Sequence, residues 1–306
     1  MRIFVTGATG FLGSYVAEDL LARGHDVAVL LRPGTSPWRL VASLDRLTVI
    51  AGTLEELGAL GRELVAFAPD AVVHMAWRGV GNRERNSKEQ ARNIVDAVEL
   101  ADLAADAGAT VFVGAGSQAE YGPYNRAISE EDAPHPTTLY GVAKLASGLM
   151  VARRCAERGQ RFAWLRIFST YGPKDGDAWL IPSLIRTLRA GGHMALTACE
   201  QRWGFLHARD AAAAVRLVLT SPAAQGIYNL GNPEAPQLRE TVSHLHELIG
   251  AGDLGFGEVP YRPDQVMVLA ADMRRLGALG WRPMVELDQG LRDTLAWHAA
   301  AEPCAT

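Results

Sequence analysis

The sequence predicts an α/β fold, with a doubly wound parallel sheet joined to a smaller, less regular C-terminal lobe. Short apolar segments alternate with amphipathic helical segments through residues 1–170, which is the pattern of successive βαβ units. The strand segments are apolar throughout, as expected for strands covered by helices on both faces. With 306 residues, 48% of them hydrophobic, the chain can bury the core of one large domain or of a domain with a lobe.

The first half of the chain supplies the sheet and the helices that cover it. Short apolar runs bounded by turn-forming residues predict strands, which we expect at 2–7, 25–32, 47–52, 71–77, 109–116 and 161–168. Helical periodicity between these runs predicts helices, which we expect at 11–24, 87–107 and 138–158. Gly24 closes the first of these helices.

The pattern loosens after residue 170, where 169–179 is rich in turn formers. Helices are expected at 180–190, 208–220, 237–249 and 286–299, with a strand at 226–231 and an extended segment at 260–272. We expect this half to form a lobe over the carboxyl edge of the sheet, where open α/β sheets bind their ligands.

Composition excludes several classes of protein. The net charge of −4 and the lack of a basic stripe argue against a nucleic-acid partner. Cys155, Cys199 and Cys304 are too widely spaced for a disulfide framework or a metal cluster, which fits a reducing cytosol. The chain begins directly with a strand pattern and contains no long apolar run. We therefore expect a cytoplasmic protein with no metal and no membrane partner.

A glycine-rich loop follows the first strand. VTGATGFLG brings Gly7, Gly10 and Gly13 to the start of the first helix. Without side chains, the backbone can turn tightly and approach a pyrophosphate, which the helix N-terminus stabilises. The motif predicts a dinucleotide-binding Rossmann domain at 1–170. We expect residues 171–306 to form mainly the substrate-binding lobe, with the chain returning to the first domain around 203–232.

The end of the second strand indicates which dinucleotide binds. An NAD binder usually has an acid there to accept hydrogen bonds from the ribose, but this chain has Leu31 followed by Arg32. A guanidinium suits a 2′-phosphate, and Ser36 and Arg39 could assist. The pattern favours NADPH or NADP over NAD, which stays open as the alternative.

Several motifs in order resemble a known family. Tyr140 and Lys144 in YGVAK lie one helical turn apart, a spacing that is common by itself. The chain also carries TGATGFLG at 6–13, HMAW at 74–77, GSQAEYG at 116–122, LRIFSTYGP at 165–173 and YNLGNP at 228–233. Together these resemble an extended short-chain dehydrogenase/reductase over nearly the whole chain, and more narrowly the sugar-nucleotide epimerase/dehydratase/reductase branch.

The resemblance implies catalytic and cofactor-binding roles. Tyr140 matches the family's proton donor or acceptor, and Lys144 matches the lysine that touches the nicotinamide ribose and lowers the pKa of the tyrosine. Ser117 matches the residue that orients the carbonyl. Besides Tyr140 and Lys144, the expected cofactor contacts are Gly7, Thr9, Gly10, Phe11, Leu12, Gly13, Arg32, Thr53, Leu54, Met75, Ala76 and Trp77.

The resemblance also implies a nucleotide-sugar substrate. Arg262 matches a pyrophosphate-binding arginine, and Arg202 is a second candidate cation. Trp77 follows the HMA loop, Glu120 stands where the family often has a small apolar residue, and Ser169 replaces a usual asparagine. We expect all five to contact substrate.

The residues near Ser117 and at the end of the second strand indicate which reaction of the branch this chain carries out. Dehydratases of the branch usually carry an acidic pair beside the position of Ser117, whereas here only Glu120 is close. The Leu31–Arg32 pair favours a reductase, because reduction uses fresh NADPH at each turnover. We expect NADPH-dependent reduction of the 4-keto group of a dTDP- or CDP-linked 4-keto-6-deoxyhexose. The alternatives are an NAD-dependent C4 epimerase of a UDP- or dTDP-sugar and, ranked lower, a non-catalytic NADP-binding sensor or scaffold. The resemblance also implies a homodimer.

Overall fold

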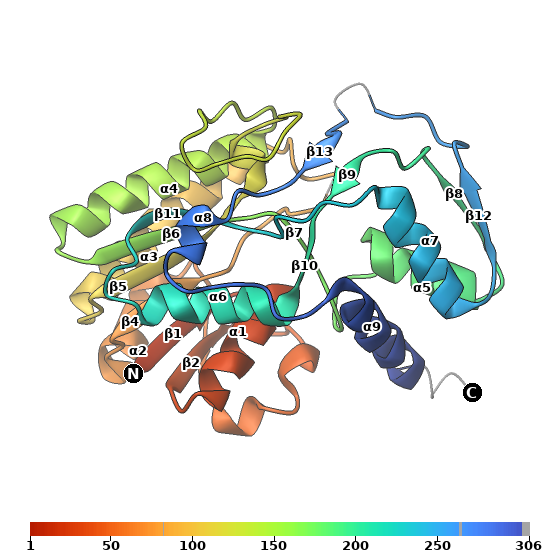
Figure 1. Cartoon of the computed structure of the whole chain (residues 1–306). Helices are drawn as coiled ribbons and strands as arrows, with labels where there is room; N and C mark the ends of the chain where they lie inside the picture. Colours follow the sequence, from red (N-terminus) through yellow and green to blue (C-terminus); the bar gives the residue numbers. More distant parts are fainter. Residues whose placement is uncertain (82, 263–264, 302–306) are drawn as a thin grey trace.

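A seven-stranded parallel sheet forms the centre of the computed structural model, which describes residues 1–81, 83–262 and 265–301 (Figure 1). Its strands are β1 (Arg2–Thr6), β2 (Asp26–Leu31), β3 (Thr48–Ala51), β4 (Ala71–His74), β5 (Val111–Ser117), β6 (Arg161–Ile167) and β11 (Gly226–Leu230). Their order is β11-β6-β5-β4-β1-β2-β3, and each neighbouring pair is parallel. The order reverses between β1 and β4, which is the switch point where such sheets bind ligands.

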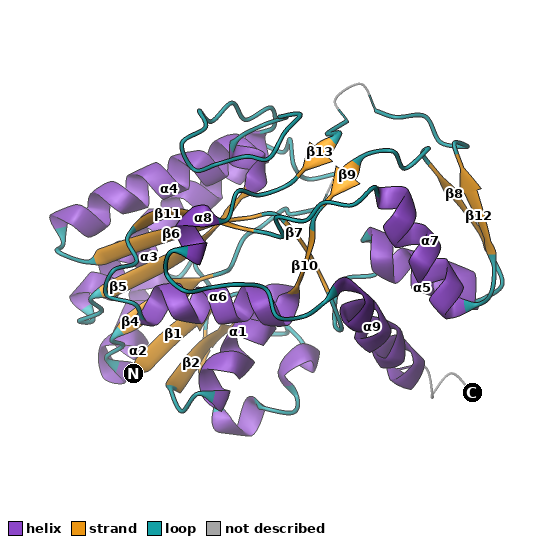
Figure 2. Cartoon of the chain, viewed as in Figure 1, coloured by secondary structure: helices purple, strands orange, loops and turns teal. Residues whose placement is uncertain are grey.

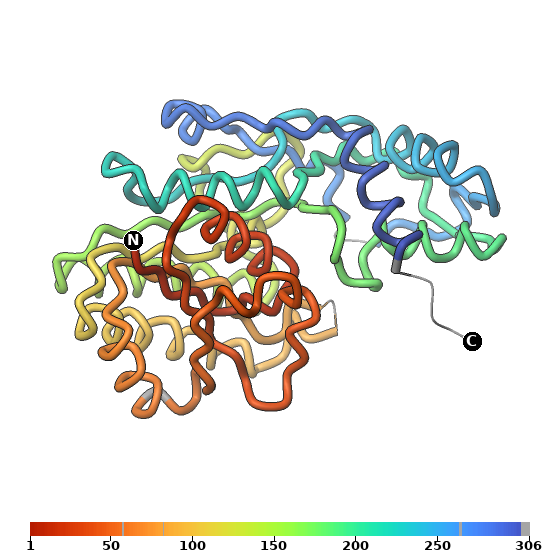
Figure 3. The backbone as a smooth tube through the Cα atoms, turned by 90° about the horizontal axis from the view of Figure 1, so that it is seen from below, coloured from red at the N-terminus to blue at the C-terminus, as the bar shows by residue number. Residues whose placement is uncertain are grey.

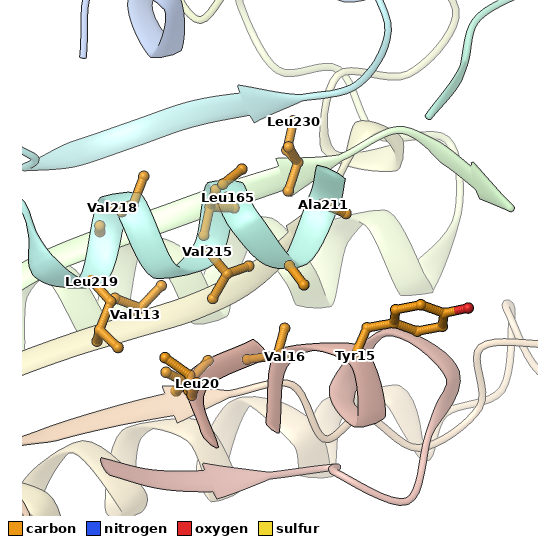
Figure 4. Packing of buried hydrophobic residues seen from close by; sticks show 14 of the residues in the cluster. Tyr15, Val16, Leu20, Val113, Leu165, Ala211, Val215, Val218, Leu219 and Leu230 are labelled. Atoms are coloured by element: carbon orange, nitrogen blue, oxygen red, sulfur yellow. The ribbon is translucent and has the colours of Figure 1, made fainter. Parts of the chain in front are cut away.

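Helices cover both faces of this sheet. One face carries α1 (Phe11–Ala22) and α6 (Ala208–Thr220), whose apolar residues meet those of the strands in one cluster (Figure 4). The other face carries α2 (Leu57–Phe67), α3 (Gln90–Asp106) and α4 (Leu139–Glu157). In β1, Ile3 and Val5 belong to the first cluster and Phe4 to the second. This alternation explains why the strand is apolar at each of these positions.

The lobe has its own hydrophobic core. It contains α5 (Leu180–Arg189), α7 (Leu238–Ile249), α9 (Leu287–Ala301) and the parallel pair β8 (His193–Leu196) and β12 (Asp253–Phe256) (Figure 2). Leu184, Leu188, Leu245 and Leu291 are fully buried in its core. Seen from below, the first strand and the last helix, α9, lie in different parts of the molecule, the strand in the sheet and α9 in the lobe (Figure 3).

Short elements connect the two parts. β7 (Ser169–Tyr171) pairs with β10 (Phe205–His207), and β9 (Arg202–Trp203) pairs with β13 (Val268–Leu269). From β10 the chain returns to the sheet through α6 and β11, and α8 (Arg274–Gly277) packs near β11. Of the segment expected to be extended, 263–264 lie outside the described residues, as does Cys304.

Candidate functional site

The glycine loop is built for close backbone approach. Gly7 has a φ of +72°, and a Cβ there would lie 2.5 Å from the backbone nitrogen of Ala76. A Cβ on Gly13 would collide with the carbonyl oxygen of Gly7. The N–H of Gly10 donates to that oxygen at 2.9 Å, and Gly10 caps α1 without a side-chain hydrogen bond. The first amides of α1 are therefore left for an anion, and the loop fits the pyrophosphate of a dinucleotide.

The two arginines expected near the adenosine of the cofactor differ in exposure and in partners. Arg32 follows β2 with an exposed side chain. Arg39 is engaged by backbone, since its Nε donates to the carbonyl of Lys174 at 2.8 Å and its Nη1 to that of Thr9 at 3.2 Å. The suggested help of Arg39 in phosphate binding is replaced by a role in joining the glycine loop to the segment after β7. The expected contact of Arg32 with a 2′-phosphate stays a prediction.

Ser117, Tyr140 and Lys144 come together at the carboxyl end of β5. Ser117 ends this strand, and the other two lie on the first turns of α4, which begins after the Thr138 side chain accepts from the Gly141 N–H at 3.1 Å. Ser117 faces Tyr140, and its hydroxyl acts to lower the pKa of Tyr140. The Ser117 hydroxyl also accepts from the Ala119 N–H at 3.2 Å, so its own proton is free to donate.

Lys144 is buried and held by two neighbours. Its Nζ donates to the carbonyl oxygen of Ala115 at 2.6 Å and lies 3.7 Å from the centroid of the Trp77 ring. Burial lowers the pKa of Lys144 to about 7, opposed by the charge of Glu120. Trp77 is itself fixed, because its Nε1 donates to Gln90 at 2.9 Å.

The resemblance implies a lowered pKa for the Tyr140 phenol, whereas burial in the structure acts in the opposite direction. Burial raises the pKa of Tyr140, and the hydroxyl of Ser117 and the charge of Arg85 only partly oppose this rise. The Nζ of Lys144 lies 5.9 Å from the centroid of the Tyr140 ring and 3.7 Å from that of the Trp77 ring.

Glu120 lies in the interior behind Ser117, only 1% exposed. One carboxylate oxygen accepts from the Ser117 N–H at 2.8 Å and from Trp164 Nε1 at 2.9 Å, and the other from Arg166 Nε at 2.7 Å. Both oxygens are thus occupied by protein groups. The expected substrate contact of Glu120 is revised to a structural role, that of holding the turn that begins at Ser117.

The lobe provides a separate cavity of about 320 Å³. Its lining includes Leu180, Gln201, Trp203 and Arg262, so the cavity contains one of the two expected cations. Arg202 lies on β9 with an exposed side chain, and Ser169 is half-buried on β7. The size and the apolar walls suit a ring of nucleobase dimensions.

Thr53, Leu54 and Met75 are half-buried beyond the ends of β3 and β4. They belong to the same carboxyl edge as the glycine loop, where a bound cofactor would extend. His74 is buried beside them and hydrogen-bonded to the Thr6 hydroxyl at 2.8 Å. Burial, with a smaller effect of the Lys144 charge, lowers the pKa of His74 to about 3, so its ring is neutral and structural.

Sequence reasoning missed Arg85 and Gln90, which contact Tyr140 and Trp77 respectively. Arg85 lies in the polar segment that follows β4, whereas Gln90 begins α3 and falls within the helix expected at 87–107. Only the contacts of the folded chain identify them, because nothing in the local sequence shows that Arg85 meets Tyr140 or that Gln90 accepts from Trp77.

Comparison with known proteins identifies the family. The family described as NAD dependent epimerase/dehydratase matches residues 3–231. The chain belongs to this family. The dTDP-glucose 4,6-dehydratase of Streptomyces griseus is 29% identical over 97% of this chain and 94% of its own length. The GDP-6-deoxy-D-mannose reductase of Pseudomonas aeruginosa is 28% identical over 97% of each chain.

A solved structure extends the comparison to the fold. MoeE5 in complex with UDP-glucose and NAD aligns with a TM-score of 0.84 at 27% identity, over 98% of this chain and 99% of that one. The predicted Rossmann fold and the resemblance to sugar-nucleotide enzymes of the epimerase/dehydratase family are therefore confirmed. Among the described residues, no helix is both long and apolar enough to cross a membrane. Within 1–81, 83–262 and 265–301, no group of three His, Cys, Asp or Glu side chains is arranged to hold a metal ion.

Proposed function

We propose that this enzyme reduces the 4-keto group of a dTDP- or CDP-linked 4-keto-6-deoxyhexose with NADPH. The observation that carries the proposal is the grouping of Ser117, Tyr140 and Lys144 at the edge of the sheet that carries the glycine loop. Glu120, the acid nearest to Ser117, forms an interior ion pair with Arg166. The site has the donors that a carbonyl reduction needs. It lacks, in the part of the chain described, an acidic pair beside Ser117 that would serve dehydration.

Ser117, Tyr140 and Lys144 each have a separate role in the proposed reaction. The Ser117 hydroxyl donates a hydrogen bond to the keto oxygen and stabilises the negative charge that develops there. Tyr140 gives its proton to the same oxygen as it becomes an alkoxide, and the product is the hydroxyl. Lys144 would hold the nicotinamide ribose, and the glycine loop would hold the pyrophosphate. When bound, NADPH supplies the hydride that reduces C4.

The choice of cofactor rests on the end of β2. The strand ends at Leu31, and the exposed Arg32 follows it, so a cation stands where an NAD binder usually has an acid. A guanidinium attracts the 2′-phosphate of NADPH and offers paired donors to it.

An NAD-dependent C4 epimerase of a UDP- or dTDP-sugar is the second candidate. Two observations favour it: the solved MoeE5 structure contains NAD and UDP-glucose, and Arg39 is engaged by the carbonyls of Thr9 and Lys174, which leaves one arginine fewer for a 2′-phosphate. An epimerase would retain NAD through purification, because the hydride that leaves the sugar returns to it. It would need no added cofactor.

One assay separates the two candidates. The loss of reduced-nicotinamide absorbance is followed with NADPH and with NADH, using dTDP- and CDP-linked 4-keto-6-deoxyglucose. We expect stoichiometric oxidation of NADPH, with NADH slower. A purified enzyme that carries bound NAD, oxidises neither reduced cofactor and interconverts UDP-glucose and UDP-galactose contradicts the reductase and supports the epimerase.

We also propose that the chain is a homodimer. Val95 on α3 and Val142, Leu149 and Met150 on α4 are between 45% and 60% exposed. Apolar side chains gathered on two neighbouring helices suit burial against a second copy. Sedimentation equilibrium measures the state directly, and a monomer at micromolar concentration would contradict the dimer.

A further inference from the structure

A second cavity, of about 350 Å³, lies between α4 and the edge strand β11. Phe162 and Trp164 of β6 form its inner wall, and their rings stack with centroids 6.2 Å apart and planes 18° apart. On α4, Gly148 leaves room for the Trp164 ring, because a Cβ there would lie 3.0 Å from that ring. Leu149, 60% exposed, stands where the cavity reaches the surface. The cavity shares no described lining residue with the cavity of the lobe.

The lining of this cavity suits an uncharged aromatic ligand. Besides the two rings, Leu145, Ala152 and Ile227 contribute apolar surface. A volume of this size with mainly apolar walls and few polar groups is typical of small-molecule sites, and aromatic walls favour stacking with a flat ring. Glu120 and Arg166 also line the cavity, but they pair with each other at 2.7 Å. Their charges therefore offset one another and select no ion.

One polar group of the lining has no partner. Gln160 is 7% exposed, and its Nε2 donates to the carbonyl of Ala109 at 2.8 Å. This bond fixes the orientation of the side-chain amide, because a carbonyl oxygen can only accept. The Oε1 of Gln160 is buried and has no hydrogen-bond partner among the residues that the structure describes. Buried acceptors are rarely left unpaired, and an N–H or O–H of a ligand would satisfy this one.

The cavity is connected to Ser117 through a single carboxylate oxygen. Oε1 of Glu120 accepts from Trp164 Nε1 at 2.9 Å and from the Ser117 N–H at 2.8 Å. The ring of Trp164 forms the cavity wall. A ligand packed against this ring would therefore act on the oxygen that also holds the backbone of Ser117.

We propose that this cavity is an effector site for an uncharged aromatic molecule of one or two rings that carries an N–H or O–H donor. The ligand stacks on Trp164, donates to Gln160 Oε1 and alters the position of Ser117 through Glu120. The binding of the ligand is independent of the proposed function. Only its effect on turnover rests on the role proposed for Ser117.

Fluorine NMR tests the binding, with indole as the probe. The chain contains 7 tryptophans, and protein made with ring-fluorinated tryptophan gives each its own signal, that of Trp164 being assigned with Trp164→Phe. Indole should shift the Trp164 signal with a dissociation constant of about 0.1–1 mM, the affinity expected of so small a ligand. N-methylindole has no donor for Gln160 and should bind about five- to tenfold more weakly.

Two variants and a control locate the site. Ala152 is half-buried on α4, and Ala152→Phe should fill the cavity and abolish the shift. Ala66→Phe, at an exposed position of α2, should leave indole binding unchanged. Gln160→Met should make indole and N-methylindole bind equally. The comparison of the two ligands on the wild type requires no variant to fold.

Four results overturn the site: no shift of the Trp164 signal in millimolar indole, a shift of the Trp203 signal alone, a Trp164 shift that persists in Ala152→Phe, or equal affinities of the two ligands for the wild type. Saturating indole should also change kcat for the keto sugar at least about twofold in the wild type and not in Ala152→Phe. An unchanged kcat with indole bound overturns the connection to Ser117. Inactivity on every keto sugar would contradict the proposed function, and the fluorine signals would still test the site.

Discussion

Replacing Glu120 by an uncharged residue should destabilise the protein strongly, because Glu120 forms one half of a buried ion pair. The Glu120–Arg166 pair is 1% and 3% exposed, and its Oε2–Nε distance is 2.7 Å. Glu120→Gln leaves the Arg166 guanidinium buried against the Tyr121 ring, 4.3 Å away, with no opposite charge. Breaking one side of a buried pair costs about 3–5 kcal/mol. We therefore expect the free energy of unfolding to fall by about this amount.

A matched control is available on the surface of α4. Glu157 pairs with Arg154 at 2.6 Å, but both side chains are 38% exposed, so Glu157→Gln should destabilise the protein far less than Glu120→Gln. Denaturant unfolding of the two variants gives the comparison. The double variant Glu120→Met with Arg166→Met should be more stable than either single variant, because no buried charge is left unpaired.

One result would refute this account of Glu120. If Glu120→Gln unfolds like the wild type and instead raises KM for the nucleotide sugar, then the carboxylate contacts substrate and the interior role is wrong. The stability and kinetic measurements therefore distinguish the two roles with one variant.

Three further predictions concern the cofactor end and Lys144. A Cβ on Gly13 would lie 3.0 Å from the Cα of Ala8 and closer still to the carbonyl of Gly7, whereas a Cβ on Gly58 would meet open space. Gly13→Ala should therefore weaken cofactor binding more than about tenfold, measured by fluorescence titration. Gly58→Ala, the control, should leave cofactor binding unchanged. Arg32→Ala should weaken NADPH binding about 10–100-fold, because one charge-assisted contact with the 2′-phosphate is lost, and should leave NADH binding unchanged. Equal losses of affinity for both cofactors would contradict the 2′-phosphate role. The folded-state pKa of Lys144, about 7, lies below its usual 10.5, so the unfolded state binds more protons between these values and the free energy of unfolding rises with pH across this window. Lys144→Met should flatten that rise in denaturation measured at both ends of the window, and an unchanged slope would assign the rise to other groups.

Local sequence patterns predicted the glycine loop and several helices, because neighbouring residues determine these elements. The glycine loop and the strand that precedes it follow from spacing alone, because the turn, the helix start and the close approach of Gly7 to Ala76 all depend on residues lacking a side chain. The helices expected at 138–158 and 208–220 are observed at Leu139–Glu157 and Ala208–Thr220. The helix at Leu57–Phe67 was missed, because two glycines in LGALGRELVAF weaken its local signal.

The environments of the site residues depend on contacts far apart in sequence. Glu120 is neutralised by Arg166, 46 positions away, and no local pattern reveals that pair. Lys144 faces Trp77, and Tyr140 faces Arg85, only because the segment after β4 folds back over α4. The sequence could therefore predict that Ser117, Tyr140 and Lys144 lie at the carboxyl end of one strand and the start of one helix, but not the distant residues that surround them.

The most direct test of the central claim is the turnover of Tyr140→Phe. Removing the phenolic hydroxyl deletes the proposed proton donor and leaves the glycine loop and Lys144 in place. We predict that oxidation of NADPH by dTDP-4-keto-6-deoxyglucose slows about 10²–10⁴-fold, the usual contribution of a general acid, while NADPH affinity stays close to that of the wild type. Wild-type turnover in Tyr140→Phe would contradict the claim that this side chain protonates the sugar oxygen.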